Sequence, residues 1–237
     1  MRCGFHAGVF GICAALVLLT SCHERREESP SVAAIRDNMP PMLLRIDEQA
    51  DGIVATVPTG DWPRVFAYVR DINDAWADYE HPTTSPYPRQ GRPPGSMLKS
   101  KLAAAVAALQ REAMAQNPGG TVRAANEVSG NALDLFDYYR PGFPPDLRRL
   151  RVLERQVVID AEARDFNNMS GTLNRITYVW RDVRPTVLAR ADDATMQAFE
   201  DNIAAQEAAL RTRDAPTLAY RAGNVLALLD EIQHPYP

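Results

Sequence analysis

The sequence predicts an all-α protein, an antiparallel helical bundle built from two duplicated long helical hairpins. Apolar residues recur every three or four positions through most of the chain after residue 40, the spacing of one face of an α-helix. No segment shows a convincing strand pattern. The third observation is an internal repeat, which constrains the architecture because both copies should adopt the same fold.

The repeat relates residues 40–78 to residues 144–182 by a shift of 104 positions, without a gap. Nine of these 39 positions are identical, and they include Trp76 with Trp180 and the two prolines that open each copy. So many identities over so short a segment indicate a duplication. Each copy should therefore bury an apolar stripe along its helices.

We assign residues 40–140 to a first helical-hairpin repeat and residues 141–237 to a second, and we expect the two to share one bundle. The alternative is two small bundles in tandem, the arrangement of imelysin-like periplasmic proteins. The Gly-x-His-x-x-Glu motif of those proteins is absent from this sequence, so the likeness is one of fold only.

The first 21 residues have the features of a signal peptide. Arg2 supplies the positive charge, and residues 7–19 are apolar or small, a run too short for a bilayer-spanning helix, which needs about 20 residues. The segment ends in Leu-Thr-Ser followed by Cys22. This ending matches the lipobox, so the segment resembles the signals of bacterial lipoproteins.

The resemblance implies that Cys22 carries fatty acids such as palmitate and becomes the first residue of the mature protein. Several acyl chains hold a protein firmly on a membrane. Residues 22–39 would then be the lipidated cysteine and a charged tether. In lipoproteins an Asp after the lipidated cysteine favours the inner membrane. His23 stands there, so we expect a protein that faces the periplasm from the outer membrane.

Composition argues against several functions. Cys3 and Cys13 leave with the signal and Cys22 is acylated, so the mature domain keeps no thiol for catalysis or metal binding. Asp and Glu number 30 against 26 Lys and Arg, a balance that argues against binding nucleic acid. Phosphate-binding and hydrolase motifs are also missing. We expect neither an enzyme nor a cofactor.

The first repeat should contain a helix over residues 40–80 that is broken or kinked at Pro-Thr-Gly 58–60, where Asp61 can cap the restart. Residues 81–95 carry five prolines and are predicted to be a loop. Two further helices are expected, over about residues 98–116 and 121–139.

The second repeat lacks the Pro-Thr-Gly break. We therefore expect one helix of about 40 residues, roughly 60 Å long at 1.5 Å per residue, from residue 144 to Pro185. Pro185 and the residues up to Asp192 would connect it to the next helix. The remaining helices should cover about residues 193–213 and 214–233.

Trp76 and Trp180 could line a shared aromatic pocket, but their helical spacing favours symmetric core packing. Asp61 and Asp165 could be paired catalytic carboxylates, although an Asp before an apolar helical run is more often a cap. Glu154 falls on the apolar stripe of the second repeat. A buried carboxylate would be a functional hint, and an Arg partner or a position at the helix edge is the more common explanation.

Two acid-x-x-His pairs, Asp78 with His81 and Glu231 with His234, have the spacing found in di-iron bundles. In a single up-down bundle the first and fourth helices end at opposite poles, so the two histidines could not share a metal. We therefore expect no metal site, and these four residues remain the alternative ligands.

The proline-rich loop carries Tyr87, Arg89 and Arg92, and such segments present side chains to a partner at low entropic cost. We expect the loop to lie at the pole opposite the tether. The resulting hypothesis is a lipid-anchored, non-enzymatic protein that binds an envelope protein or a cell-wall partner. The alternative is a carrier of a metal or small ligand inside the bundle.

Overall fold

The structure is a computed structural model, and it describes residues 40–81, 95–139, 146–189 and 191–233. These residues form eight α-helices and one 3₁₀ turn, and no strand occurs among them. The prediction of an all-α helical bundle is confirmed. The signal, the tether, the proline-rich segment and His234 lie outside the described residues.

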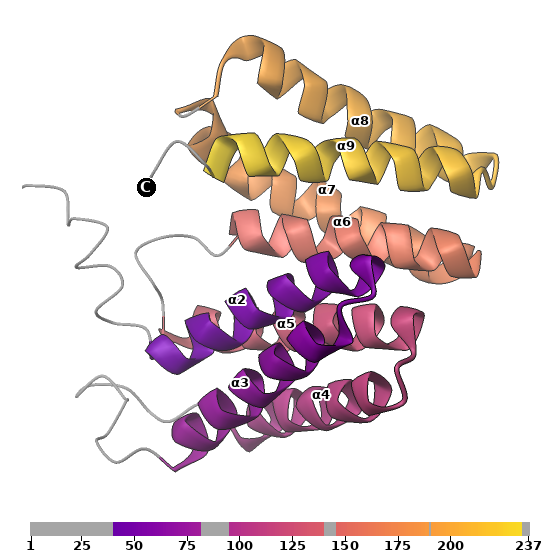
Figure 1. Ribbon diagram of the computed structural model, residues 1–237. Helices are drawn as coiled ribbons and strands as arrows, with labels where there is room; N and C mark the ends of the chain where they lie inside the picture. Colours follow the sequence, from indigo (N-terminus) through magenta and orange to yellow (C-terminus); the bar gives the residue numbers. More distant parts are fainter. Residues whose placement is uncertain (1–39, 82–94, 140–145, 190, 234–237) are drawn as a thin grey trace, which may run out of the picture.

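The first repeat forms a four-helix bundle of its own. Each helix packs against the next in the chain, and the fourth closes the ring by packing against the first (Figure 1). One continuous core of buried side chains fills this bundle, including Leu43, Ile72, Leu109 and Phe136. Its helices are α2 (Pro41–Thr56), α3 (Trp62–Glu80), α4 (Ser96–Met114) and α5 (Pro118–Tyr139).

The second repeat forms a second four-helix bundle with the same order of contacts. A separate core that includes Leu150, Ile176, Phe199 and Val225 fills it. Its helices are α6 (Asp146–Ala163), α7 (Phe166–Leu188), α8 (Asp193–Arg211) and α9 (Ala215–Gln233). The packing is thus that of the tandem alternative, and the expectation of one shared bundle was wrong.

The reason lies in the break at residues 58–60, which is a hairpin turn and not a kink. The 3₁₀ turn Val57–Thr59 follows α2, and Gly60 has a φ of 73°, a left-handed conformation that glycine adopts without strain. Asp61 then caps α3 by accepting a hydrogen bond from the backbone N–H of Arg64 at 3.2 Å. The chain therefore reverses after 16 residues of helix.

The second repeat reverses at the equivalent place, so the expected helix of about 40 residues does not form. Arg164 has a φ of 54° although it is not glycine, and Asp165 caps α7 by accepting from the N–H of Asn168 at 3.0 Å. Gln116 and Arg213, which end the turns into α5 and α9, have φ values of 48° and 54°. The duplication therefore includes the turn conformations.

Pro185 does not end its helix, contrary to expectation, because α7 continues through it to Leu188. A proline inside a helix removes one backbone hydrogen bond. Val183 and Val187, on either side of it, are 1% and 0% exposed. Burial of these side chains offsets the cost, so the last turn stays helical.

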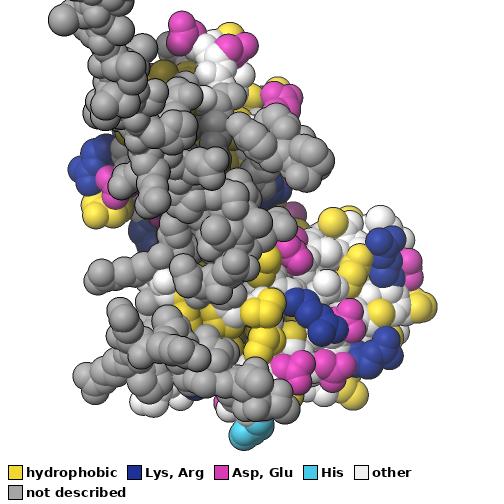
Figure 2. Space-filling view, turned by 90° about the vertical axis from the view of Figure 1, so that its left-hand side faces the viewer, with side chains coloured by type: hydrophobic (Ala, Val, Ile, Leu, Met, Phe, Trp, Pro, Cys, Tyr) yellow, Lys and Arg dark blue, Asp and Glu magenta, His cyan; other side chains and the backbone are white. Residues whose placement is uncertain are grey.

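The two ends of the molecule carry different connections. In each bundle the first helix begins and the second ends at the left-hand end in Figure 1, which Figure 2 shows face-on. The start of α2, where the tether joins, therefore lies at the same end as the end of α3, where the proline-rich segment begins. The expectation that this loop leaves from the pole opposite the tether was wrong, because the α2–α3 turn reverses the chain.

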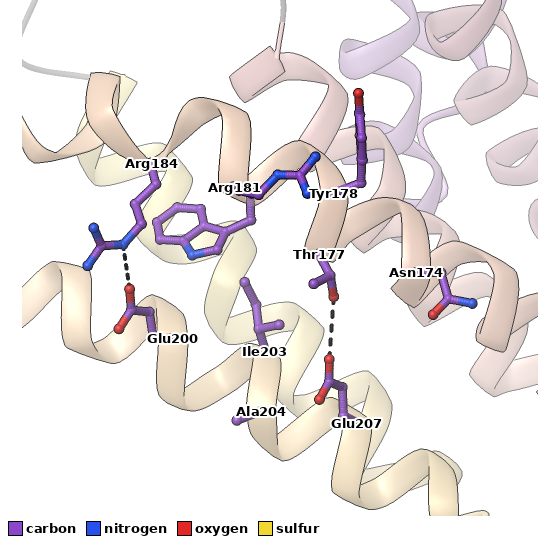
Figure 3. A pocket seen from close by; sticks show the side chains of 10 residues that line it. Asn174, Thr177, Tyr178, Arg181, Arg184, Glu200, Ile203, Ala204 and Glu207 are labelled. Atoms are coloured by element: carbon purple, nitrogen blue, oxygen red, sulfur yellow. Dashed lines mark hydrogen bonds and ion pairs between the residues drawn. The ribbon is translucent and has the colours of Figure 1, made fainter.

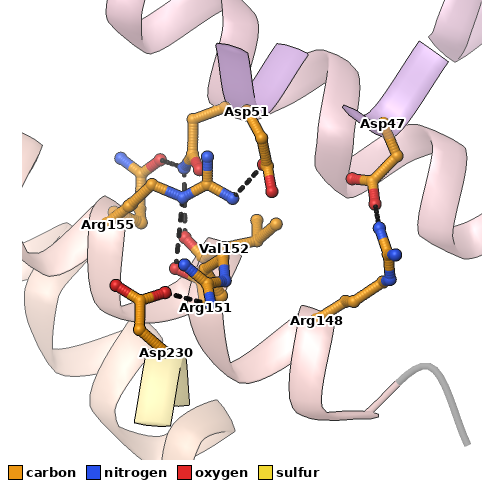
Figure 4. Close-up of polar contacts among 9 residues, drawn as sticks. Asp47, Asp51, Arg148, Arg151, Val152, Arg155 and Asp230 are labelled. Atoms are coloured by element: carbon orange, nitrogen blue, oxygen red, sulfur yellow. Dashed lines mark hydrogen bonds and ion pairs between the residues drawn. The ribbon is translucent and has the colours of Figure 1, made fainter. Parts of the chain in front are cut away.

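The two bundles meet through ion pairs. Helix α6 packs against α5, and two of its arginines reach aspartates of α2: Arg148 pairs with Asp47, and Arg155 pairs with Asp51 at 2.7 Å (Figure 4). Arg149 of α6 pairs with Asp134 and Asp137 of α5 at 2.9 and 2.6 Å. Arg123 of α5 faces Asp160 of α6 at 3.8 Å, the opposite polarity. The contact is therefore mainly between basic side chains of α6 and acidic side chains of α2 and α5.

The centre of this contact is small and apolar. Val152 of α6 packs against the core of the first bundle, and one of its methyl groups lies 3.6 Å from where a Cβ on Gly130 would be. Asn126 donates to the carbonyl of Val152 and to Gln156, both at 3.1 Å. Because the apolar contact is small, the ion pairs must provide a large part of the interactions that hold the two bundles together.

Removal of Arg148 should therefore destabilise the protein. Asp47 is 2% exposed, and burial raises the pKa of Asp47 although Arg148 opposes the rise. We expect Arg148→Met to lower the free energy of unfolding by about 2–4 kcal/mol, because it leaves a buried carboxyl group without its partner. Asp47→Leu combined with Arg148→Met should recover most of the loss. Urea denaturation of both variants would check this, and an equal loss in the double variant would contradict it.

Candidate functional site

An open groove runs between α7 and α8 on the surface of the second bundle, with a volume of about 620 Å³ (Figure 3). The residues of α7 form one wall and those of α8 the other. This is the size range of ligand-binding clefts. The lining residues are Asn174, Thr177, Tyr178, Trp180, Arg181, Arg184, Glu200, Ile203, Ala204 and Glu207.

The floor of the groove is apolar and firmly packed. The indole of Trp180 stacks on the ring of Phe199 with centroids 4.7 Å apart and planes 8° from parallel. Ile203 and Ala204 of α8 continue the floor. Both stacked rings belong to the core, so the floor is a packed apolar surface that is open from one side.

The walls carry opposite charges. Arg181 and Arg184 line the α7 side and Glu200 and Glu207 the α8 side. Arg184 bridges the groove to Glu200 at 2.7 Å. Thr177 contacts Glu207 more weakly, at 3.4 Å. An occupant with charges on its two edges could therefore pair with both walls.

Tyr178 stands at the rim of the groove and is 60% exposed. The guanidinium of Arg181 lies over its ring, 4.8 Å from the centroid. An exposed tyrosine with an adjacent arginine combines two of the residue types that are enriched among the energetically important residues of protein interfaces.

Trp76 and Trp180 are 8% and 7% exposed and occupy equivalent helices, as the repeat predicts. They do not form a shared pocket, because they belong to different cores. Trp76 packs beside Tyr79, with ring centroids 5.7 Å apart. Unlike Trp76, Trp180 also lines the groove, where its indole forms part of the floor.

Asp61 and Asp165 are helix caps, as expected, and lie in separate bundles. Glu154 is a different case, because the expected arginine partner was wrong. Its side chain is 0% exposed, and its hydrogen-bond partner is Gln206 of α8 at 3.0 Å. Burial raises the pKa of Glu154 to about 8, and the hydrogen bond from Gln206 opposes the rise.

The alternative metal ligands are not brought together. Asp78, His81 and Glu231 are exposed, the first two at the end of α3 and the third near the end of α9. These two helices end at the same end of the molecule, contrary to the expectation of opposite poles, but they belong to different bundles. Within the described ranges, no group of three or more His, Cys, Asp or Glu side chains could hold a metal ion.

The groove itself was not predicted. The internal repeat singles out Trp180 as the counterpart of Trp76, but the other lining residues belong to no sequence motif. Tyr87, Arg89 and Arg92, the contact residues that the sequence suggested, lie outside the described residues. The site that the structure adds is therefore formed by residues of ordinary type whose arrangement depends on the spacing of two helices.

Comparison with family models, with curated proteins and with solved structures gave no match. Among the helices that the structure describes, none is both long enough and apolar enough to cross a membrane.

Proposed function

We propose that this protein is anchored by lipid at Cys22, faces the periplasm from the outer membrane, and acts by binding an envelope protein without catalysing a reaction. The observation that carries the binding role is the groove between α7 and α8. It combines an apolar floor, walls of opposite charge and an exposed Tyr178. The lipobox that ends at Cys22 supports the anchor and the location.

The occupant that fits this groove is an amphipathic helix of a partner protein. A groove between two antiparallel helices can accept the apolar face of a third helix. The partner helix would place its apolar face on Trp180 and Ile203. Acidic side chains on one of its edges would meet Arg181, and basic ones on the other edge would meet Glu207.

The proline-rich segment is a second proposed contact, through Tyr87, Arg89 and Arg92. It begins at the end of α3, at the same end of the molecule as the start of α2. This contact would therefore be made on the side from which the tether leaves, close to the membrane that holds the lipid.

Photo-cross-linking in living cells tests both contacts. With p-benzoylphenylalanine in place of Tyr178, we expect an adduct with an envelope protein that mass spectrometry can identify. Tyr220 is the matched control, because it is 64% exposed and also lies beneath an arginine, Arg221, but on α9 outside the groove. The same probe at Tyr87 reports on the proline-rich segment.

The groove-filling variant Ala204→Trp makes the test specific. It should remove the Tyr178 adduct while leaving the far-ultraviolet circular dichroism unchanged, because Ala204 is exposed and its side chain faces the groove. An identical adduct from Tyr220, or a Tyr178 adduct that persists after Ala204→Trp, would contradict binding in the groove.

A further inference from the structure

Glu154 and Gln206 face each other across the interior of the second bundle, from α6 to α8. Both side chains are 0% exposed. The amide of Gln206 donates to Oε2 of Glu154 at 3.0 Å. The other oxygen of each group, Oε1 of Glu154 and Oε1 of Gln206, has no hydrogen-bond partner among the described residues. Buried polar atoms of this kind are rare and call for an explanation.

A proton on Glu154 accounts for both unpartnered atoms at once. A protonated carboxyl group has one O–H donor, and Oε1 of Gln206 is an acceptor. The acid and the amide can then form two hydrogen bonds side by side, one in each direction. An ionised Glu154 has no donor to offer and would leave both oxygens unpaired in the core, at a substantial cost.

The surroundings of Glu154 also favour the neutral acid. Burial raises the pKa of its carboxyl group to about 8, and no charged side chain is among the causes of the shift. Arg151 and Arg155, which lie within one turn of Glu154 on its own helix, pair with Asp230 and Asp51. Along the facing helices, Arg221 of α9 turns to Asn202 at 3.4 Å, and Glu207 of α8 contacts Thr177 of α7.

Gln206 belongs to the helix that forms the acidic wall of the groove. It lies one turn after Ile203 and next to Glu207, both of which line the groove. Helix α8 packs more extensively against α9 than against α7. The hydrogen bond to Glu154 is therefore a tie that holds this stretch of α8 against α6, across the bundle from the groove.

We propose that the protonation state of Glu154 controls the groove. As a neutral acid, Glu154 holds α8 against α6 through its hydrogen bonds with Gln206. When Glu154 ionises, these bonds weaken, α8 moves away from α6, and the packing of the groove floor loosens. An ionised carboxylate in this position has to gain water, and α8 has to yield for water to enter. Because α8 is one wall of the groove, proton release changes the site at which we propose the partner helix binds. The effect of pH on partner binding rests on that proposed function, whereas the pH-dependent release of α8 does not.

Trp180 is a built-in reporter, since its ring forms the groove floor and stacks on Phe199 of α8. Trp62→Phe and Trp76→Phe together leave it as the only tryptophan. We expect its emission and its quenching by acrylamide to change between pH 5 and 9, with a midpoint near 8 and with more quenching on the alkaline side. In Glu154→Gln, whose amide reproduces the two-bond pair, the low-pH signal should persist over the whole range.

Circular dichroism at 222 nm must stay constant over this range, so that the change reports on α8 and not on unfolding. If the protein unfolds at alkaline pH, the titration of the Glu154 carboxyl carbon by NMR replaces the fluorescence readout. A midpoint below pH 6, no transition, or an equal transition in Glu154→Gln would overturn the proposal. No partner is present in this measurement, so its failure is separate from a failure of the cross-linking at Tyr178.

Discussion

At pH 9, Glu154→Gln should raise the free energy of unfolding by about 3–5 kcal/mol, and at pH 4 it should leave it nearly unchanged. Burial raises the pKa of this carboxyl group from 4.5 to about 8 in the folded protein. Below pH 4.5 the group is neutral in both states. As pH rises from 4.5 through 8, the unfolded chain releases its proton first, and each unit of difference in pKa costs about 1.4 kcal/mol of stability.

Urea denaturation at pH 4, 7 and 9 would measure the effect, and the gain at pH 7 should be intermediate. Glu162→Gln is the matched control, because Glu162 lies on the same helix but is exposed. The control should change stability by less than about 0.5 kcal/mol at every pH. A gain that is the same at pH 4 and pH 9 would show that Glu154 does not titrate between them.

Trp76→Ala and Trp180→Ala should each lower the free energy of unfolding by about 3–5 kcal/mol, because each removes a large buried ring and leaves a cavity. Each substitution should destabilise mainly its own bundle, since the two rings belong to separate cores. Hydrogen exchange should speed up mainly in α2–α5 for the first variant and mainly in α6–α9 for the second.

Met114→Ala is the control for this pair, because Met114 is 73% exposed and its truncation should cost less than about 0.5 kcal/mol. If both tryptophan variants accelerated exchange equally in all eight helices, the two bundles would unfold as one cooperative unit. The contacts between the bundles, including the partly buried ion pairs, would then be strong enough to couple the unfolding of one bundle to that of the other.

The sequence was sufficient for the helical segments of the first repeat and for the cap at Asp61, but not for the direction of the chain between helices or for the division of the second repeat. Pro58 and Gly60 indicate that one helix ends, and Asp61 indicates that another begins. The same residue types occur both at helix kinks and at hairpin turns, so they do not tell the two apart. At Arg164 no such signal exists, because the left-handed conformation there belongs to a non-glycine residue. The helical hairpins were therefore predicted at twice their length, and one bundle was expected instead of two.

The Glu154–Gln206 pair and the groove could not be predicted from the sequence, because both depend on contacts between helices that are far apart in the chain. Gln206 lies 52 residues from Glu154, and no pattern in the sequence pairs a glutamate with a glutamine at that distance. The groove likewise depends on how closely α7 approaches α8, a property that hydrophobic spacing does not encode. What the sequence did supply was the position of Glu154 on the apolar stripe.

The contact between Asp51 and Arg155 joins positions that are 104 residues apart, which are the same position in the two copies of the repeat. One helical turn earlier the two copies also differ in charge, with Asp47 in the first and Arg151 in the second, and there Arg151 pairs with Asp230 of its own bundle. After the duplication, the halves therefore acquired opposite charges where they touch, and neither can now replace the other. A chain made of two first halves would set Asp51 against another aspartate, so a recombination that restores identical halves would be selected against.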